Sequence, residues 1–384
     1  MDVHQLGRED FEQAYDLGCY AFQVTDKEEQ REKAKRAWDQ AHAAHFALKH
    51  RDTIQAKLTL LSLKVNLHGR TVPMGGIASV ASYPEGRRQG HVKHLLHHAL
   101  YTMKENGQLL SYLAPFSVPF YRKYGWEIFC DEVSFELTEK QLPKPAPVYD
   151  GIIERVSFND PRIRTLYQHQ CSHGMLVRED FWWRNLAEKY ASFHTALYTD
   201  DSGTPAAYMV YQVKENKLEV NELIYNDIAA LEAIFSFIGQ HDSMIQSASI
   251  PATGADTLHY FLPDPHTKAE VSPYFMLESL MLKALCLFFR LQARVILPLR
   301  LRTNLQSGTI RPSPYWLMEI ILAVHDPKDT PQFSLTIGTL TGLLLGYRRP
   351  SFYLKSGQIT GDAKAIASFC RFIPNNEPGL IDFF

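Results

Sequence analysis

The segment from Gly75 to Gly125 constrains the fold more strongly than any other part of the sequence. It contains, in order, an apolar strand, the basic turn Arg87–Gly90, an amphipathic helix, a second apolar strand and a short helix with Tyr121. The hydrophobic period changes between two and 3.6 residues along this segment, as in alternating strands and helices. The order predicts a mixed α/β sheet with helices on both sides.

The residues around this segment extend the same sheet. The pattern of apolar positions predicts two helices and a strand ahead of it, and the turn His68-Gly69-Arg70 leads into a partner strand. We therefore expect residues 1–142 to form one domain. Its predicted helices are 9–22, 27–41, 90–105 and 119–123, and its predicted strands are 54–67, 71–80, 109–114 and 132–137.

Alternating prolines at 143–147 are typical of an extended linker and mark a domain boundary. Residues 148–275 then repeat the general order of the first domain, with helices at 161–169, 178–190 and 228–239 around strands at 194–199, 206–213, 218–224 and 247–249. This repeat lacks a basic glycine turn and an FYxxxG-like element. If it is a duplicate, it has lost the chemistry of those two motifs. Residues 276–384 predict a small α+β unit that ends in Leu-Ile-Asp-Phe-Phe.

Composition excludes several classes of protein. The 384 residues are 45% hydrophobic and 21% charged, as in a soluble globular protein of two or three domains. A net charge of -2 indicates no domain-wide surface for nucleic acid. Five scattered cysteines without a CxxC pair predict neither disulfides nor a zinc site and fit the reducing cytoplasm. The N-terminus lacks a signal pattern, and the longest apolar run, near 280–289, is too short to span a membrane.

The histidines of the predicted helix 90–105 raise the question of a metal. His94 and His98 have the i, i+4 spacing of zinc ligands, but no HExxH glutamate accompanies them. We interpret them as part of a solvated or phosphate-facing helix surface and expect no metal.

The turn Arg87–Val92 has the pattern R-x-x-G-x-V at the start of a helix. Unpaired N–H groups and the helix dipole favour an anion there, and Gly90 allows close approach of the backbone to a phosphate. Alone, the pattern also fits a basic surface turn that caps a helix. The strand at 77–82 that leads into the turn favours the ligand-binding interpretation.

Tyr121 is the candidate proton donor. Acyl transfer to an amine needs a base for the amine and an acid for the departing thiolate, and a tyrosine hydroxyl near the sulfur can supply the proton. With nineteen tyrosines in the chain, an ordinary core or surface aromatic is the alternative. The position of Tyr121 after a strand and before Tyr124-Gly125-Trp126 favours the functional role.

Together these motifs resemble the GNAT N-acetyltransferase superfamily: Gly75-Gly76-Ile77-Ala78-Ser79-Val80, Arg87-Arg88-Gln89-Gly90 and Phe120-Tyr121-Arg122-Lys123-Tyr124-Gly125-Trp126. The order of three units resembles the enhanced intracellular survival (Eis) branch, as do Asn221-Glu222-Leu223, His241-Asp242-Ser243-Met244, Leu344-Leu345-Gly346-Tyr347-Arg348-Arg349-Pro350 and the aromatic C-terminus. The resemblance implies an active GNAT domain (1–142), a degenerate one (148–275) and a sterol-carrier-protein-like domain (276–384). Val92 departs from the glycine or alanine common in the superfamily, although the Eis branch tolerates larger residues there.

The resemblance also implies a function. The protein would be an acetyl-CoA-dependent N-acetyltransferase that acts by direct attack of a primary amine of a cationic acceptor, such as an aminoglycoside or a polyamine-like molecule. It would form a homo-hexamer in the cytoplasm, with no metal, membrane or nucleic-acid partner. Val80, Ala81 and Ser82 would hold the pantetheine arm, and the pyrophosphate would be held by Arg87, Arg88, Gln89, Gly90, His91, Val92 and Lys93.

The same resemblance makes Tyr121 the general acid and the α-carboxylate of Phe384 the general base. A terminal carboxylate has a pKa of about 3.3–3.7 and is a weak base unless burial raises that value. A frayed terminus is the ordinary alternative, against which the two terminal aromatics argue.

Two other functions stay open at this point. One is a tandem-GNAT transferase with another acyl donor, such as an aminoacyl or myristoyl transferase. The other is a non-catalytic protein whose sterol-carrier-like unit holds a lipid. Acyl-CoA competition and lipid copurification would separate these from the leading interpretation.

The stretch from Ser279 to Met318 differs in composition from the rest of the chain. No Asp or Glu occurs between Ser279 and Met318, where five arginines and Lys283 do. A basic loop or an oligomer contact would explain this. A compensated frameshift over 277–318 is the other hypothesis, because loss of one base from codons for the Eis-like Met-Ala-Arg-Ile-Val-Asn-Val-Lys gives Met-Leu-Glu-Ser-Leu-Met-Leu-Lys, the sequence of 276–283.

Overall fold

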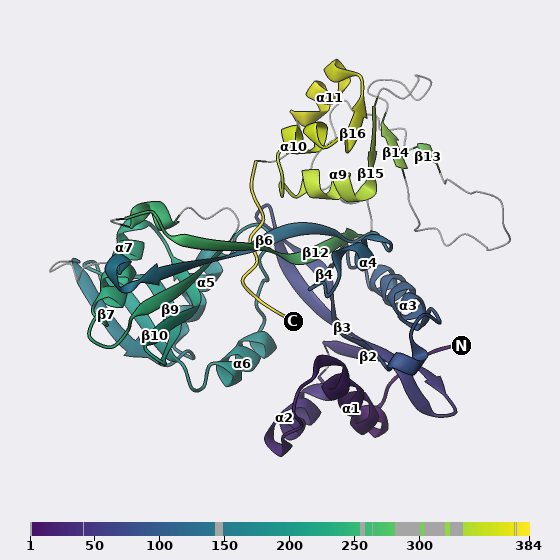
Figure 1. Ribbon diagram of the computed structural model, residues 1–384, viewed down its shortest axis with the longest axis horizontal. Coiled ribbons are helices and arrows are strands. Elements are labelled where there is room, and N and C mark those ends of the chain that lie inside the picture. The colour runs from purple at the N-terminus through teal and green to yellow at the C-terminus, as the bar shows by residue number, and fades with distance from the viewer. Residues whose placement is uncertain are drawn as a thin grey trace.

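The computed structural model describes residues 2–40, 42–142, 149–253, 258–262, 264–280, 300–302, 319–322, 333–371, 373 and 375–384. Two units lie side by side along one continuous sheet, and a smaller third unit lies against them (Figure 1). The C-terminal segment leaves the third unit and ends between the other two (Figure 1). The predicted linker at 143–147 lies outside the described residues.

The first unit contains nearly all the elements that its sequence predicts. Its elements are β1 (Val3–Gln5), η1 (Arg8–Asp10), α1 (Phe11–Phe22), α2 (Glu28–Trp38), β2 (Ala43–His50), β3 (Thr53–Leu67), β4 (Arg70–Ser82), η2 (Pro84–Gly86), α3 (His91–Glu105), β5 (Leu110–Leu113), α4 (Val118–Arg122), β6 (Glu127–Thr138) and η3 (Glu139–Gln141). The prediction lacked β2, whose sequence AAHFALKH has no β-branched residue to mark it as a strand.

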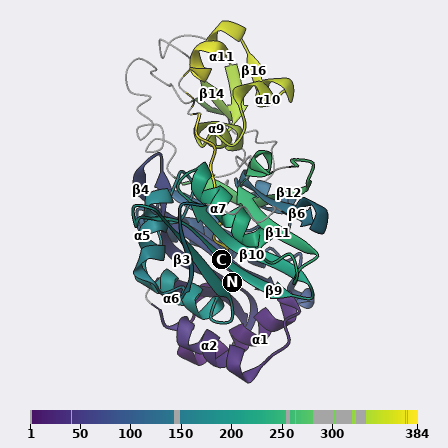
Figure 2. The same cartoon turned by 90° about the vertical axis from the view of Figure 1, so that its left-hand side faces the viewer.

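The second unit repeats this order. It contains β7 (Gly151–Val156), α5 (Pro161–Gln170), α6 (Asp180–Lys189), β8 (His194–Asp200), β9 (Pro205–Lys214), β10 (Lys217–Tyr225), α7 (Ile228–Gly239), β11 (Ser247–Thr253), η4 (Leu258–Phe261) and β12 (Lys268–Ser279). The third unit, uppermost in Figure 2, contains β13 (Arg300–Arg302), β14 (Glu319–Leu322), β15 (Phe333–Thr336), α9 (Ile337–Leu344), α10 (Pro350–Lys355), β16 (Ile359–Gly361) and α11 (Ala363–Cys370).

The first two units exchange their last strands. The twelve-stranded sheet has the order β1-β2-β3-β4-β5-β12-β6-β11-β10-β9-β8-β7. Strand β12 of the second unit pairs with β5, with Met276 opposite Leu113, while β6 of the first unit pairs with β11. The exchange therefore links the two units through main-chain hydrogen bonds. The domain boundary predicted after residue 275 falls inside β12.

Each unit has an opening in the sheet where two parallel strands separate. Strand β4 pairs with β5 only as far as Ile77 opposite Leu113, although β4 continues to Ser82. Strand β10 pairs with β11 only as far as Glu219 opposite Ser249 and continues to Tyr225. Both long strands carry a bulge near the point of separation. The two openings are equivalent positions in the duplicated fold.

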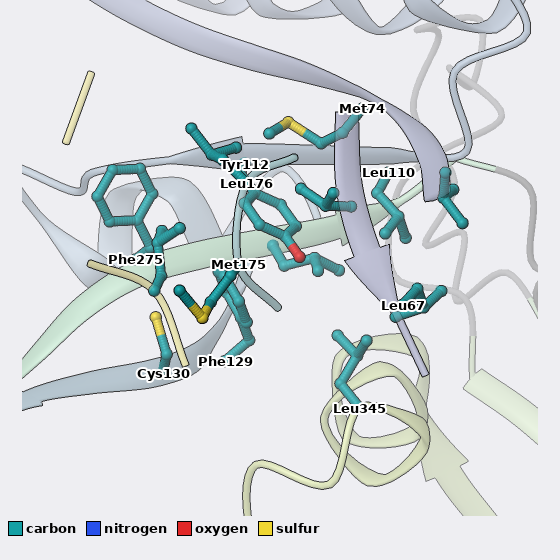
Figure 3. Close-up of a cluster of buried hydrophobic side chains, with 14 of the residues drawn as sticks. Leu67, Met74, Leu110, Tyr112, Phe129, Cys130, Met175, Leu176, Phe275 and Leu345 are labelled. Carbon is teal, nitrogen blue, oxygen red and sulfur yellow. The ribbon is translucent and has the colours of Figure 1, made fainter. Parts of the chain in front are cut away.

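A shared hydrophobic core fixes the three units relative to one another. Leu67, Met74 and Tyr112 of the first unit lie in one cluster with Leu176 of the second and Leu345 of the third (Figure 3). Side chains of this size contribute about 1.5–3 kcal/mol each when fully buried. The C-terminal segment, which packs against this cluster, is thus held by a rigid surface.

Most of the stretch 277–318, on which the frameshift hypothesis rests, lies outside the described residues. Its first residues do not, and they are unusual. Glu278 and Ser279 of β12 are buried, and within the described ranges neither Glu278 Oε2 nor Ser279 Oγ has a hydrogen-bond partner. Burial raises the pKa of Glu278 to about 8. The hypothesis itself stays a prediction.

Candidate functional site

A cleft of about 680 Å³ lies beside the separated end of β4. The structure brings nine of the ten predicted cofactor residues to its wall, namely Val80, Ala81, Ser82, Arg87, Arg88, Gly90, His91, Val92 and Lys93. Gln89 does not line the cleft, and its side-chain amide donates to the carbonyl of Glu85 at 3.1 Å. One opening in the fold therefore gathers residues that the sequence analysis selected from two motifs.

The start of helix α3 forms one end of the cleft. Its N-cap residue, Gly90, has φ +83°, in the left-handed region that glycine adopts without strain, and no side chain caps the helix. The first N–H groups of a helix lack intrahelical partners, and the helix dipole adds partial positive charge at the same end. With Arg87, Arg88 and Lys93 on the same wall, this end of the cleft suits a phosphate.

The histidines of α3 have local partners. His94 Nδ1 lies 2.9 Å from the carbonyl oxygen of Gly90, and the ring of His98 packs edge-on against Phe46 with centroids 4.7 Å apart. In the part of the chain that the structure describes, no group of three or more His, Cys, Asp or Glu side chains is arranged to hold a metal ion.

Tyr121 lies beneath the cleft rather than in its wall. It is 2% exposed in α4 and packs edge-on against Phe116, Phe120 and Trp126, while Phe120 of the same helix and Tyr124 of the turn after it line the cleft. Burial raises the pKa of the Tyr121 hydroxyl, so the group stays protonated at neutral pH. That state suits a proton donor.

Gly75 and Gly76, the two glycines of the first motif, allow other side chains to pack closely on opposite faces of β4. A Cβ at Gly75 would lie 2.5 Å from Met103 Sδ of α3, and one at Gly76 would lie 2.7 Å from Cε2 of Phe384. Side chains of consecutive strand residues point to opposite faces. The ring of Phe384 therefore lies on β4 on the face opposite α3, and the C-terminus is ordered against the first unit.

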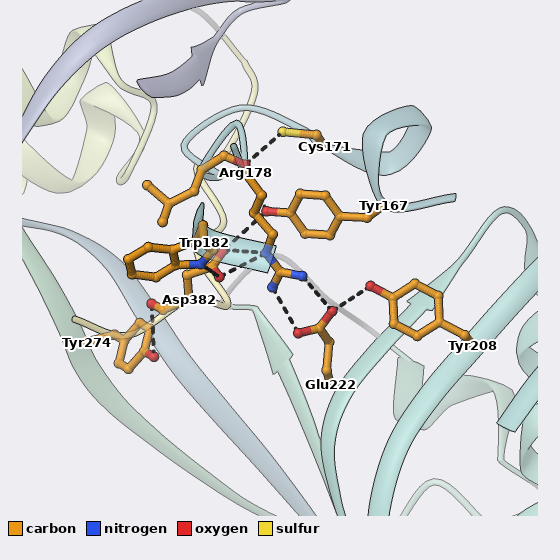
Figure 4. A network of polar contacts seen from close by, with 9 residues as sticks. Tyr167, Cys171, Arg178, Trp182, Tyr208, Glu222, Tyr274 and Asp382 are labelled. Carbon is orange, nitrogen blue, oxygen red and sulfur yellow. Dashed lines mark hydrogen bonds and ion pairs between the residues drawn. The ribbon is translucent and has the colours of Figure 1, made fainter. Parts of the chain in front are cut away.

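A network of buried polar groups holds the residues just before Phe384 (Figure 4). Arg178 donates to both carboxylate oxygens of Glu222 at 2.8 Å and to Asp382 at 2.9 Å. All three side chains are at most 1% exposed. The sequence analysis noted Glu222 only as a motif residue and missed Arg178 and Asp382, which lie far apart in the sequence.

Lys57 is a further residue that the sequence analysis missed. Its ammonium group is buried beside Gly18 and donates to Ser79 Oγ at 3.0 Å, at the bulge of β4. Burial lowers its pKa to about 8. The position of this lysine among the apolar residues of β3 is the feature of the sequence that could have indicated a buried charge.

Comparison with known protein families shows which families share these domains. Residues 2–129 match one family described as an acetyltransferase (GNAT) domain, and residues 174–294 match a second family with the same description. The two matches together span more than half of the chain. The chain belongs to the GNAT superfamily. Residues 318–381 match the sterol carrier protein domain, which confirms the predicted tandem-GNAT and sterol-carrier-like architecture.

Solved structures with the same three-part fold agree. A probable N-acyltransferase of unknown function from Enterococcus faecalis is 26% identical, with 100% of this chain and 99% of that one covered and a TM-score of 0.83. A GCN5-related N-acetyltransferase from Anabaena variabilis is 20% identical, with complete coverage of both chains and a TM-score of 0.82. Eis1 from Mycobacterium abscessus is 15% identical over both complete chains, with a TM-score of 0.77.

A search of curated protein sequences found no significant match. The GNAT domains and their structural neighbours support an acetyltransferase enzyme. The likeness to Eis1 is one of fold, so membership of the Eis branch stays a prediction. No helix among the described residues is long and apolar enough to cross a membrane.

The second GNAT unit differs from the first at the equivalent opening. Helix α7 begins after Asp227, whose side chain accepts a hydrogen bond from the N–H of Ala230. The residues beside the opening leave a hollow of about 290 Å³, and Leu380 and Ile381 of the C-terminal segment form part of its wall. A carboxylate thus occupies the helix start that a phosphate would need, and Leu380 and Ile381 of the chain's own C-terminal segment lie at the opening.

Proposed function

We propose that the protein transfers the acetyl group of acetyl-CoA to a primary amine of a cationic acceptor, such as an aminoglycoside or a polyamine-like molecule. The observation that carries the proposal is the cleft at the end of β4, where an uncapped helix start and three basic side chains meet the strand residues Val80–Ser82. In this cleft the turn Arg87–Lys93 would hold the pyrophosphate, and the backbone of Val80–Ser82 would hold the pantetheine arm.

The chemistry needs little more than positioning and two proton transfers. The amine nitrogen forms a bond to the thioester carbon while the carbon–sulfur bond breaks. Backbone donors near Val80–Ser82 polarise the carbonyl, as in other acyl transfers. Tyr121 donates a proton to the departing thiolate, and the α-carboxylate of Phe384 accepts the proton that the amine loses.

Acidic residues next to the cleft support a cationic acceptor. Phe22 at the end of α1 lines the cleft, and Asp26 follows shortly after it. Asp26, Asp16 and Glu12 surround the single guanidinium of Arg31, with Lys35 bound to Glu12. Three carboxylates against two cations leave an excess of negative charge on the α1–α2 surface, which favours a cation at the cleft mouth.

A second candidate, a GNAT transferase with a larger acyl donor, is favoured by the apolar side of the cleft. Phe22, Phe116, Phe120 and Tyr124 line it, and Phe116 is 72% exposed. Competition between acetyl-CoA and longer acyl-CoA molecules for this cleft distinguishes the two donors. Tighter binding of a long-chain donor would favour the second candidate.

The test of the proposed function is release of free CoA thiol from acetyl-CoA over a panel of amines, with wild type beside Tyr121→Phe. We expect thiol release with polyamines or aminoglycosides that drops at least 100-fold in the variant. Absence of release with every amine would contradict the proposal. Light scattering of the purified chain tests the hexamer that the Eis resemblance implies.

A further inference from the structure

The C-terminal segment is seated in the opening of the second GNAT unit. Leu380 and Ile381 line the hollow together with residues of β10 and β11. The N–H of Gly379 donates to the carbonyl of His173 at 2.9 Å. This segment lines the position that corresponds, in the first unit, to the cleft at the end of β4.

Asp382 is the point at which the segment is fixed. Besides Arg178, its carboxylate accepts hydrogen bonds from Trp182 Nε1 at 2.7 Å and from the Tyr167 hydroxyl at 3.1 Å (Figure 4). Glu222, which follows the bulge of β10, holds the other side of the Arg178 guanidinium and accepts a hydrogen bond from Tyr208. Removing one member of such a buried group leaves an unpaired charge and is strongly destabilising, so the three side chains hold one another in place.

A second set of contacts fixes the chain beyond Asp382. The Tyr274 hydroxyl donates to the main-chain oxygen of Asp382 at 3.2 Å. The ring of Phe384 packs against Phe275 and Trp182, with centroids 4.9 and 6.2 Å away, and lies over Gly76. Only Phe383, which is 61% exposed, lies between the two anchors. The main chain at Asp382 and the ring of Phe384 are therefore both fixed, and they limit where the terminal carboxylate of Phe384 can lie.

We propose that the buried network of Arg178, Glu222 and Asp382 is a positioning device for the terminal carboxylate of Phe384. The second GNAT unit contributes to acetyl transfer by seating the C-terminal segment in the opening where it no longer holds a cofactor. The proposal rests on the proposed function, in which that carboxylate accepts the proton of the amine. Arg178, Glu222 and Asp382 act through Phe384 and are positioning residues.

Asp382→Asn tests the device, because it removes the charge and keeps the shape of the side chain. We expect kcat to fall about 10- to 100-fold, since displacement of a reacting group by about 1 Å can cost 100-fold. The KM for acetyl-CoA should stay within about twofold, because the phosphate-binding end of the cleft belongs to the first unit. Asp362→Asn, at the start of α11, is the matched control and should leave kcat unchanged.

The choice of acceptor separates positioning of a base from general damage. An amine with a pKa near 10 is protonated at neutral pH and depends on the base, whereas an amine with a pKa near 7 is largely neutral. The loss in Asp382→Asn should therefore be about tenfold larger for the first amine. An equal loss for both amines would overturn the proposal.

A second variant moves the carboxylate without touching the network. Addition of Gly-Ser after Phe384 should lower kcat as much as Asp382→Asn does, and the two changes together should cost no more than the larger alone. If Asp382→Asn does not fold, Tyr274→Phe, which leaves the ion pairs intact, replaces it and should lower kcat about threefold. Unchanged kcat in the extended chain or in the network variant would overturn the proposal. Wild type that releases no thiol with any amine contradicts the proposed function instead.

Discussion

The two GNAT units begin their equivalent helices in opposite ways. Helix α3 starts at Gly90 with no side-chain cap, next to Arg87 and Arg88, whereas α7 starts at Asp227, which caps it with a carboxylate. Exposed N–H groups attract an anion, and a capping carboxylate both satisfies them and repels one. The helix start and the basic side chains beside it together separate the unit suited to a phosphate from the unit that is not.

The openings next to these helices also differ, in the space that each leaves for a ligand. The first leaves a cleft of about 680 Å³, while the second contains Leu380 and Ile381 and leaves about 290 Å³. The second unit has the separated strands and the bulge of the first, but a carboxylate caps its helix start. The comparison teaches that two domains of one fold can share the same opening, with one left as a cleft and the other lined by a segment of the protein's own chain.

The largest expected effect is on the proton donor. Tyr121→Phe should lower kcat by about 100- to 10,000-fold, the usual contribution of general acid catalysis. Tyr260 of η4 occupies the corresponding short helix of the second unit but is 67% exposed, so Tyr260→Phe should leave kcat unchanged. Steady-state thiol release measures both, and equal effects would remove the distinction between the units.

The next largest effect is on acetyl-CoA binding, when the first unit receives the acidic helix start of the second. Gly90→Asp should weaken acetyl-CoA binding about 100-fold, because a carboxylate about 4 Å from a phosphate costs several kcal/mol at a protein surface. Gly90→Asn, which has the same shape without the charge and tolerates the left-handed backbone, is the control and should lose far less. Calorimetric titration with acetyl-CoA measures the difference; similar losses in both would show that shape rather than charge matters.

Buried charge at the two bulges gives a third contrast. Lys57 faces the β4 bulge and donates to the neutral hydroxyl of Ser79, whereas Glu222 at the β10 bulge is paired with the charged Arg178. Burial lowers the folded-state pKa of Lys57 from 10.5 to about 8, so the unfolded chain binds more protons between these values and stability rises with pH there. Lys57→Met should lack this rise and be more stable than wild type at pH 7 by up to about 3 kcal/mol.

Urea denaturation at pH 7 and at pH 10 checks this prediction. A Lys57→Met variant whose stability changes as much as that of wild type between pH 7 and pH 10 would show that Lys57 is not the group that titrates.

The smallest effect is on the second helix start. Asp227→Ala removes a cap worth about 1 kcal/mol, so amides in the first turn of α7 should exchange about fivefold faster. Acetyl-CoA binding should not change. Hydrogen exchange followed by mass spectrometry measures the first effect, and tighter or additional acetyl-CoA binding in this variant would contradict the account.

The local parts of this fold could be predicted from the sequence, and its long-range parts could not. Hydrophobic period and turn residues located most helices and strands, and the strand and helix-start motifs together selected nine residues that line one cleft. Neither signal carries information on the exchange of β6 and β12, because both strands pair with partners from the other unit. The sequence did not predict the network around Asp382 for the same reason, because Arg178, Glu222 and Asp382 come together only in the folded chain.

Glu278 shows a conflict between local sequence and fold. A buried carboxyl group with a pKa raised to about 8 and no partner for Oε2 among the described residues destabilises the strand that carries it. Such conflicts are uncommon in natural sequences outside functional sites. The position is the third residue of the segment 276–283 that the frameshift hypothesis reproduces, and resequencing of the gene decides between an unusual residue and an altered reading frame.

The stoichiometry of acetyl-CoA binding tests most directly the claim that only the first GNAT unit holds the cofactor. Calorimetric titration of the full chain should give one site per chain, lost in Gly90→Asp and kept in Asp227→Ala. Two sites per chain, or one site that survives Gly90→Asp, would contradict it.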